Sequence, residues 1–159
     1  MTAAATDRPL TPEDIIVRPA HFADLGAIAR FIEPFVEVGK LLPRTPAELD
    51  ELIPQGFLAT VEEAEPGSRG SVERIVGFAA LEVYSAKLAE VRSLAVDDRL
   101  RGLGVGRRLV AACIERAESL RVLEVMAISA EEEFFRRCGF DFTLPGQKKA
   151  FFIQTRDQP

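Results

Sequence analysis

The feature that most limits how this chain can fold is a run of alternate glycines between a strand-like segment and a helix-like segment. Residues 88–96 are largely apolar and predict a strand. Gly102, Gly104 and Gly106 follow, and from Val105 onward apolar residues recur at helical spacing. Glycine permits positive φ, so successive N–H groups can face one side, next to the positive end of the helix dipole. This arrangement favours the binding of an anion such as a phosphate.

The rest of the chain alternates between helix-like and strand-like segments. Residues 75–84 and 88–96 are separated by Ser85–Lys87, which is hairpin spacing. Thr45 and Glu48 have the spacing of a capping box at a helix start, and Pro34 is expected to end an earlier helix. The loop at residues 62–73, with Pro66, Gly67 and Gly70, is expected at a solvent-facing hairpin tip.

These segments give the predicted order of secondary structure. Strands are predicted at 15–18, 57–61, 75–84, 88–96, 122–128, 140–144 and 150–155, and helices at 22–35, 46–53, 105–120 and 131–137. Such a sequence of elements indicates the α/β class, with a mixed sheet and helices packed on its faces.

The composition is that of an ordinary folded protein. Of the 159 residues, 47% are apolar and 28% are charged, and this length fits a single domain. We expect a flexible tail over residues 1–14 and one domain over residues 15–159. No apolar run is long enough to cross a membrane, and the N-terminus lacks the pattern of a signal peptide, so a cytoplasmic location is expected.

Few residues suit metal binding or covalent catalysis. Cys113 and Cys138 have no neighbours at ligand spacing, and His21 is the single histidine, so neither a metal site nor a disulfide framework is expected. The net charge of −5 argues against nucleic-acid binding. Residues 92–108, in contrast, hold five arginines and two aspartates. This local excess of positive charge favours an anion site at the glycine loop.

Two common phosphate-binding loops do not fit. A Walker loop needs Lys and then Ser or Thr after its last glycine, whereas Gly106 is followed by Arg107 and Arg108. A dinucleotide-binding loop needs a different glycine spacing, although Glu124 lies at the distance of its acidic residue. A glycine-rich turn with solvated arginines remains the alternative to a phosphate site.

The same stretch carries a family resemblance. Arg101-Gly-Leu-Gly-Val-Gly106 fits the Gln/Arg-x-x-Gly-x-Gly/Ala pattern of the GNAT superfamily of N-acetyltransferases, and Phe134–Phe140 resembles its later helix-to-strand segment. Residues 32–45, 77–81, 89–96 and 144–149 are similar to the acetyltransferase domain of amino-acid N-acetyltransferases, the N-acetylglutamate synthases of arginine biosynthesis. The resemblance implies the GNAT fold: a mostly antiparallel sheet with splayed middle strands and about four helices. It implies a short stand-alone form without the amino-acid kinase domain.

The resemblance also implies acetyl-CoA as the co-substrate, with no metal. Backbone groups of the strand before the loop would pair with the pantetheine arm, and the loop amides would hold the diphosphate. The residues expected to bind acetyl-CoA are Leu94, Ala95, Val96, Arg101, Gly102, Leu103, Gly104, Val105, Gly106 and Arg107.

Direct transfer of the acetyl group to a primary amine, without a covalent enzyme intermediate, is the reaction that the resemblance implies. Glu90 is the candidate base because it lies on the strand that carries Leu94. Phe135 and Phe152 stand where the family has tyrosines, so Tyr84, the only tyrosine, is a weak substitute for the acid. A thiolate with a parent thiol pKa of about 8.5 can also leave without an acid.

Glutamate is the expected acceptor, and its carboxylates call for cationic side chains. Arg44 and Arg156 match family positions that bind substrate carboxylates, and Lys40 and Arg92 are weaker candidates. Residues 131–133 are three glutamates that would repel an anionic acceptor if they line its site. Two alternatives therefore stay open: an enzyme for a polyamine or a peptide N-terminus, and a non-catalytic acetyl-CoA-binding module. If the chain associates, a homodimer is the expected form.

Overall fold

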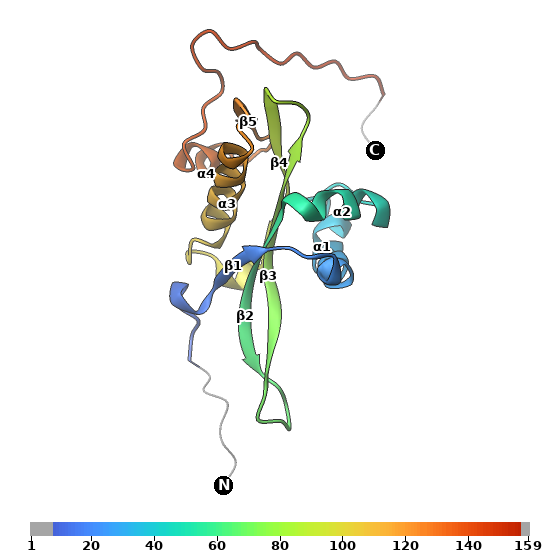
Figure 1. Cartoon of the computed structure of the whole chain (residues 1–159), viewed down its shortest axis with the longest axis vertical. Helices are drawn as coiled ribbons and strands as arrows, with labels where there is room; N and C mark the ends of the chain where they lie inside the picture. Colours follow the sequence, from blue (N-terminus) through green and yellow to red (C-terminus); the bar gives the residue numbers. More distant parts are fainter. Residues whose placement is uncertain (1–7, 157–159) are drawn as a thin grey trace.

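The computed structural model describes residues 8–156, which form a five-stranded sheet (Figure 1). In spatial order the strands are β1 (Ile16–Pro19), β2 (Gly56–Ala64), β3 (Ser71–Val83), β4 (Leu88–Val96) and β5 (Glu124–Met126). Strands β1 to β4 are antiparallel to their neighbours, and β4 and β5 are parallel. The mostly antiparallel mixed sheet predicted from the sequence is therefore confirmed.

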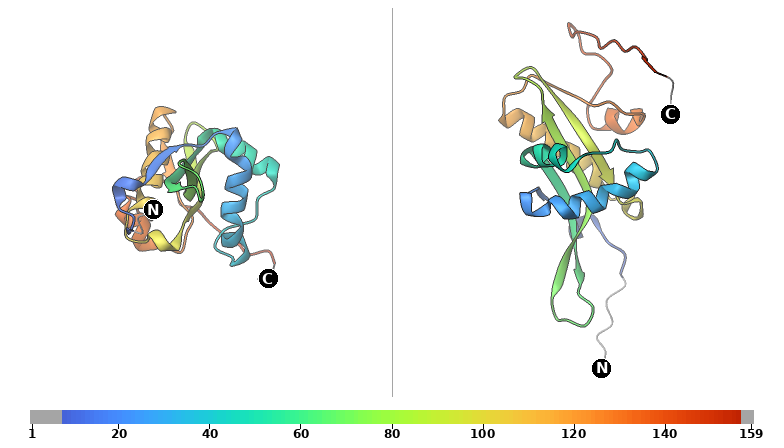
Figure 2. Two further views of the ribbon diagram at one scale, coloured as in Figure 1. Left: turned by 90° about the horizontal axis from the view of Figure 1, so that it is seen from below. Right: turned by 90° about the vertical axis from the view of Figure 1, so that its right-hand side faces the viewer.

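Within residues 8–156, four α-helices cover the two faces of this sheet. Helices α1 (Leu25–Glu37) and α2 (Pro46–Leu52) lie on one face, and α3 (Val105–Ser119) and α4 (Glu132–Arg137) lie on the other (Figures 1 and 2). Short 3-10 turns, η1 to η4, occupy Pro12–Asp14, Phe22–Asp24, Ile53–Gln55 and Asp98–Leu100. The helix count agrees with the expectation from the sequence.

Each face of the sheet has its own apolar core, because side chains alternate along β3. Phe78 packs with Ile28 of α1 in one cluster, whereas Leu81 belongs to the other cluster together with Leu109 of α3. All four side chains are at most 1% exposed. Burial of a side chain of this size stabilises the fold by about 1.5–3 kcal/mol relative to exposure.

The predicted start of α2 is confirmed and the predicted end of α1 is wrong. The Thr45 hydroxyl accepts a hydrogen bond from the Glu48 N–H at 3.2 Å, and the Glu48 carboxylate accepts one from the Thr45 N–H at 2.7 Å. Helix α1 continues through Pro34 to Glu37. A proline removes one backbone hydrogen bond, and helix packing can compensate for that loss.

The hairpin between β2 and β3 is longer than predicted. Pairing continues to Ala64 opposite Ser71, so the predicted loop over residues 62–73 shrinks to residues 65–70. Charged side chains stabilise the extension: the Arg74 guanidinium contacts Glu63, and the Arg18 guanidinium contacts Glu73. Periodicity of apolar residues cannot reveal a hairpin whose two faces are both solvated.

Among the described residues, the strands predicted after residue 139 do not form. Residues 140–144 and 150–155 have no strand pairing, and Phe151, Phe152 and Ile153 are 91%, 80% and 87% exposed. Strand β5 covers only Glu124–Met126 of the predicted 122–128, and the N–H of Val122 bonds instead to Ala117 at the end of α3. A segment with the composition of a strand forms one only if a sheet edge is available for pairing. The sequence of the segment does not show whether such an edge is available.

The first described residues of the chain form a short turn that contacts α3. Residues 1–7, half of the predicted tail, lie outside the described residues, and Pro12–Asp14 form the turn η1, whose Pro12 carbonyl accepts a hydrogen bond from Arg108. Among residues 8–156, none of the helices combines the length and apolarity needed to cross a membrane.

Candidate functional site

Strands β4 and β5 separate after a short paired region. Their parallel pairing joins Leu88, Ala89 and Glu90 to Glu124, Val125 and Met126, and β5 ends there while β4 continues to Val96. Within the described residues, no strand pairs with residues 91–96 on the β5 side. The backbone groups on this edge are therefore available to an extended ligand.

A bulge in β4 begins just beyond the separation. Phe78 pairs with Ala95 and Ala80 with Arg92, so the single residue between them on β3 faces Ser93 and Leu94 together. Ser93 has a φ of 56°, in the left-handed region. An extra residue shifts the alternation of side chains by one, so Arg92 faces α1 and α2 whereas Leu94 packs on the α3 side.

The glycine loop leads directly from this strand into α3. Gly102 and Gly104 have φ values of 82° and 75°, and a Cβ added at either would meet no atom within 4 Å. Gly104 is the N-cap of α3, whose first N–H groups have no acceptor within the helix. Gly106 instead packs against α4, because an added Cβ would lie 3.2 Å from the Phe134 ring. The loop thus offers exposed backbone donors that side chains do not cover.

The cationic side chains around the loop are partly paired with acids. Arg101 contacts Asp98 at 2.9 Å, and Lys40, from the α1–α2 connection, contacts the same carboxylate at 3.7 Å. Both charges lower the pKa of Asp98, with the hydrogen bond from Arg101 contributing most. Arg107 is exposed at the start of α3. Lys40, a predicted substrate ligand, therefore lies next to the glycine loop.

Four polar side chains meet on the α1 and α2 face of the sheet, where β3 and β4 are paired. The Tyr84 hydroxyl lies 2.5 Å from the Glu90 carboxylate, and Arg92 Nη1 lies 3.1 Å from the Tyr84 oxygen. Arg92 Nη1 also contacts Glu82 at 3.0 Å and Glu90 at 3.4 Å. We call Glu82, Tyr84, Glu90 and Arg92 the polar cluster. It joins both predicted catalytic residues to a predicted substrate ligand.

Burial sets the electrostatics of the polar cluster. Glu90 is only 5% exposed, whereas Tyr84 is 48% exposed. Burial and the hydrogen bond to Glu90 raise the pKa of Tyr84 to about 12, so the phenol is protonated at neutral pH. Burial disfavours the charged form of Arg92, but the bond to Tyr84 and the carboxylates of Glu90 and Glu82 outweigh it and raise the pKa of Arg92.

The other predicted substrate ligands lie apart from the polar cluster. Arg44 is partly buried, and its Nε is buried without a hydrogen-bond partner among residues 8–156. Arg156 lies at the exposed end of the C-terminal segment, and no hydrogen bond or ion pair joins it to another described residue. Glu82 was not among the predicted site residues, although alternation along the hairpin places it on the same face as Tyr84, Glu90 and Arg92.

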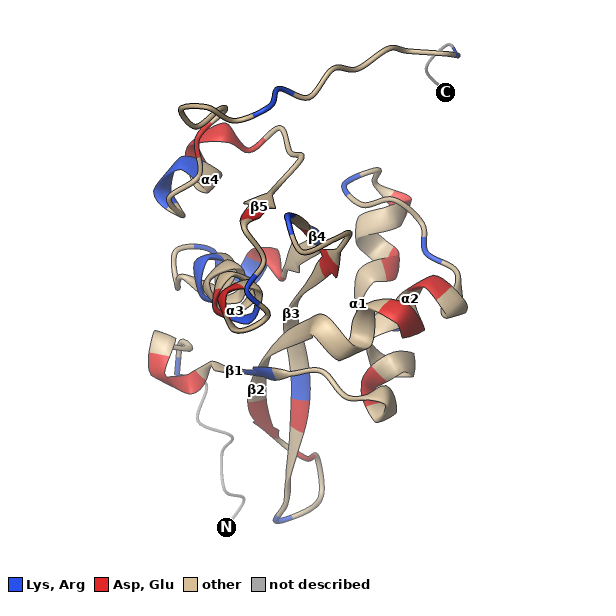
Figure 3. Cartoon of the chain, turned by 45° about the horizontal axis from the view of Figure 1, so that its top comes forward, with Lys and Arg blue, Asp and Glu red and all other residues tan. Residues whose placement is uncertain are grey.

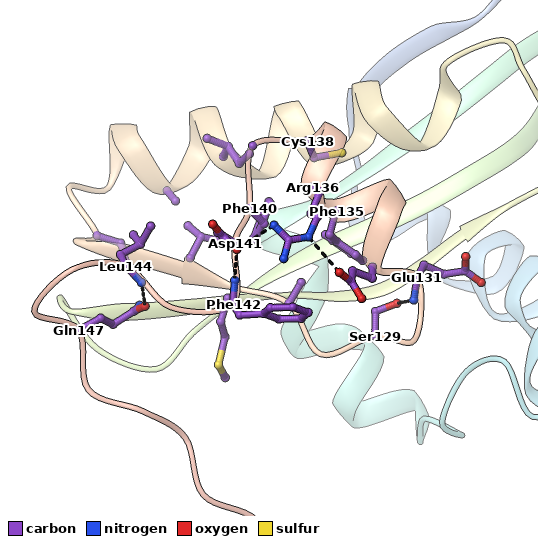
Figure 4. Close-up of a pocket in the computed structure, with 18 of the residues that line it drawn as sticks. Ser129, Glu131, Phe135, Arg136, Cys138, Phe140, Asp141, Phe142, Leu144 and Gln147 are labelled. Atoms are coloured by element: carbon purple, nitrogen blue, oxygen red, sulfur yellow. Dashed lines mark hydrogen bonds and ion pairs between the residues drawn. The ribbon is translucent and has the colours of Figure 1, made fainter.

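A cavity of about 440 Å³ lies along β5, α3 and α4 (Figure 4). Its wall includes Phe135, Phe140 and Phe142, and Arg136 lies 4.7 Å over the Phe142 ring. Met126, the residue paired with Glu90, is also part of its wall. Sequence reasoning did not predict this cavity, because it forms where three separate segments meet.

Two of the three glutamates near this cavity are paired with arginines. Glu132 contacts Arg136 at 3.0 Å, and Glu133 contacts Arg137, each one helical turn away. Figure 3 shows these opposite charges along α4. Glu131 and Glu132 line the cavity. No group of three or more histidine, cysteine, aspartate or glutamate residues within 8–156 is arranged to hold a metal ion.

Comparisons with known proteins define the class to which this fold and loop belong. Residues 56–141 match the family model described as acetyltransferase (GNAT) domain. An uncharacterised N-acetyltransferase of Chlorobaculum tepidum is 34% identical over 131 residues, covering 80% of this chain and 76% of the relative. The amino-acid acetyltransferase of Mycobacterium tuberculosis is 32% identical over 126 residues, covering 79% and 67%.

Solved structures agree with this result. Rv2747 of Mycobacterium tuberculosis, crystallised with CoA and NLQ, superposes with a TM-score of 0.65 at 30% identity, over 81% of this chain and 73% of that one. N-acetylglutamate synthase of Neisseria gonorrhoeae, with coenzyme A and N-acetyl-glutamate, gives a TM-score of 0.63 at 29% identity. The match covers 77% of this chain but 27% of that one. The chain belongs to the GNAT acetyltransferase family and is an acetyl-CoA-dependent N-acetyltransferase.

Proposed function

We propose that this enzyme transfers the acetyl group of acetyl-CoA to the primary amine of a small amino acid, and that glutamate is its acceptor. Relatives named amino-acid acetyltransferase, with the chain aligned over 79% of its length, support the amino-acid substrate. The solved N-acetylglutamate synthase supports glutamate in particular. The proposal includes a single acetyltransferase domain over residues 15–159, cytoplasmic and acting in arginine biosynthesis.

Acetyl-CoA is proposed to bind along the free edge of β4 and across the glycine loop. Backbone groups of Leu94 and Val96 would pair with the pantetheine arm, as an added strand does. The N–H groups between Gly102 and Arg107 would hold the diphosphate, aided by the dipole of α3. The open space around Gly102 and Gly104 supports this assignment.

Glu90 is proposed to accept the proton that the amine loses as the new bond to carbon forms. A buried carboxylate beside the point where β4 and β5 separate suits such a base. The N–H groups of the bulge at Ser93 and Leu94 are suited to stabilise the oxyanion that develops on the thioester carbonyl.

The observation that best supports an acidic acceptor is the guanidinium of Arg44. Its buried Nε has no acceptor among the described residues, and a buried donor without a partner is costly. A carboxylate of glutamate would satisfy it with a charge-assisted hydrogen bond. Lys40 and Arg156 are further candidates for the acceptor's carboxylates. Pairing of Glu132 and Glu133 with arginines reduces the repulsion that these glutamates would otherwise exert on an anion.

Release of the CoA thiol, measured with a panel of amines, tests this function. We expect turnover with glutamate well above that with polyamines or a peptide N-terminus. Preference for a polyamine or a peptide would contradict the acceptor assignment, and tight CoA binding without turnover would contradict catalysis. Arg44→Ala should raise the KM for glutamate by about 10- to 100-fold, which corresponds to one lost hydrogen bond to a charged group. Arg69→Ala, at the exposed tip of the β2–β3 hairpin, is the matched control.

A further inference from the structure

The polar cluster contains a pairing that is unfavourable for stability. Glu82 and Glu90 are directly opposite each other across β3 and β4. Like charges at such positions repel, and one of these two carboxylates is buried. Arg92 lies between them, with Nη1 at 3.0 Å from Glu82 and 3.4 Å from Glu90. A partly buried arrangement of two acids and one base, with Glu90 almost fully buried, is weak evidence for stability, so a function is the better explanation.

The hydrogen bonds of the cluster give the Tyr84 hydroxyl a fixed direction. A phenol has one proton to donate, and Arg92 has only donors. Because Arg92 Nη1 donates to the Tyr84 oxygen, the Tyr84 proton must point to a carboxylate. The Glu90 carboxylate lies at 2.5 Å and the Glu82 carboxylate at 3.3 Å, so the proton is directed to Glu90. Glu82 is then free to bind Arg92.

Tyr84 also connects the buried carboxylate to the surface. Glu90 is almost fully buried, whereas nearly half of Tyr84 is exposed. The chain has no other tyrosine, and the two positions where the resemblance implies a tyrosine are Phe135 and Phe152. Within the cluster, Tyr84 is thus the O–H group that can carry a proton between Glu90 and a reacting atom.

We propose that Glu82 and Arg92 are positioning residues that hold Tyr84 and Glu90 as one proton relay. Glu82 holds the Arg92 guanidinium, which in turn holds the Tyr84 oxygen and directs its proton to Glu90. As the nitrogen–carbon bond forms, the amine proton goes to the Tyr84 oxygen while the Tyr84 proton passes to Glu90. As the carbon–sulfur bond breaks, Glu90 returns this proton to the Tyr84 oxygen and the O–H proton of Tyr84 goes to the thiolate, which restores the starting state. This proposal rests on the proposed acetyl transfer, and it removes Arg92 from the candidate ligands of the acceptor.

A double-mutant cycle between Glu82 and Tyr84 tests the proposal, with the best amine of the panel. Tyr84→Phe should lower kcat by about 100-fold, and Glu82→Gln by about 10-fold, with the KM of both substrates within about twofold of wild type. In the Tyr84→Phe background, Glu82→Gln should have almost no further effect, because Glu82 acts through Tyr84. Glu82→Asp should recover part of the loss, and Glu62→Gln, at an exposed position near the end of β2, should leave kcat unchanged.

Results of two kinds would overturn the relay. The first is an unchanged kcat in Glu82→Gln, and the second is a full additional loss in the double variant. Thermal unfolding of each variant checks that it folds. If the wild type acetylates no amine, the proposed function fails. The geometry can still be tested by alkaline titration of Tyr84, because the chain has a single tyrosine and no tryptophan absorbance overlaps that of its phenolate. Arg92→Met should raise the pKa of Tyr84 further, since the hydrogen bond from Arg92 lowers it. An unchanged titration would contradict the arrangement.

Discussion

Gly77 of β3 lies directly against Leu109 of α3. A Cβ built on Gly77 would be 2.8 Å from Leu109 Cδ1 and 3.1 Å from Val105 Cγ1, both buried. Helix α3 thereby lies close to the sheet at the point where it leaves the glycine loop. The distance between helix and sheet in this region depends on the absence of one side chain.

Gly77→Ala should therefore destabilise the fold. The added methyl group must displace two packed side chains, and overpacking of this kind costs about 1–3 kcal/mol. Urea unfolding would measure the change. Gly26→Ala is the matched control, because a Cβ there would meet only the end of Arg30 at 3.5 Å, within helix α1. Equal stability of Gly77→Ala and wild type would contradict the described packing.

Arg121→Gly should stabilise the protein. Arg121 follows α3 with a φ of 57°, and the bonds from its N–H to Glu118 and from Val122 to Ala117 form a Schellman motif. Glycine avoids the left-handed strain of about 1 kcal/mol at this position. We expect a gain of about 0.5–1 kcal/mol in the free energy of unfolding. Arg121→Ala removes the same charge but keeps the strain, so a similar gain in that variant would show that charge is the cause.

Asp97 should contribute stability that depends on pH. The hydrogen bond from Arg99, and less strongly that from Arg74, lower the pKa of Asp97 from 3.8 to about 2. A carboxyl with a depressed pKa in the folded state stabilises the fold above its unfolded pKa, and loses this contribution as the pH falls towards its folded pKa.

Asp97→Asn removes this charge and can keep the cap on the Arg99 N–H. We expect a loss on the order of 1 kcal/mol at neutral pH, because the partner Arg99 is largely exposed. In urea unfolding at several pH values, the difference from wild type should shrink between about pH 4 and pH 2. Asp50→Asn, at an exposed position of α2, is the control. A difference that does not vary with pH would show that the ion pairs do not cause it.

Local signals predicted much of this structure. Thr45 and Glu48 determine the start of α2 within four residues, and the glycines after β4 determine the loop before α3, because each pattern acts through neighbouring backbone groups. The end of α1 and the strands after residue 139 depend on packing between distant segments. Phe151 and Ile153 have the composition of a strand, yet within the described residues they have no paired partner.

The polar cluster could be predicted only in part from the sequence. Glu90 and Tyr84 were predicted separately, and their hydrogen bond follows from the register of β3 on β4, in which Val83 faces Ala89. A short hairpin loop fixes that register, so the position of Glu82 opposite Glu90 could have been predicted from the sequence. The bulge at Ser93 could not have been predicted, because serine carries no signal for a left-handed φ in a strand.

Calorimetry of coenzyme A binding tests the central claim most directly, with two matched glycine variants. Gly104 and Gly67 have φ values of 75° and 80°, and neither has an atom within 4 Å of an added Cβ, so alanine strains both to a similar extent. We predict one coenzyme A bound per chain to wild type and to Gly67→Ala, and affinity at least about tenfold weaker for Gly104→Ala, whose methyl group would occupy the diphosphate site. Absence of binding to wild type, or equal affinity of the two variants, would contradict a cofactor held by the glycine loop.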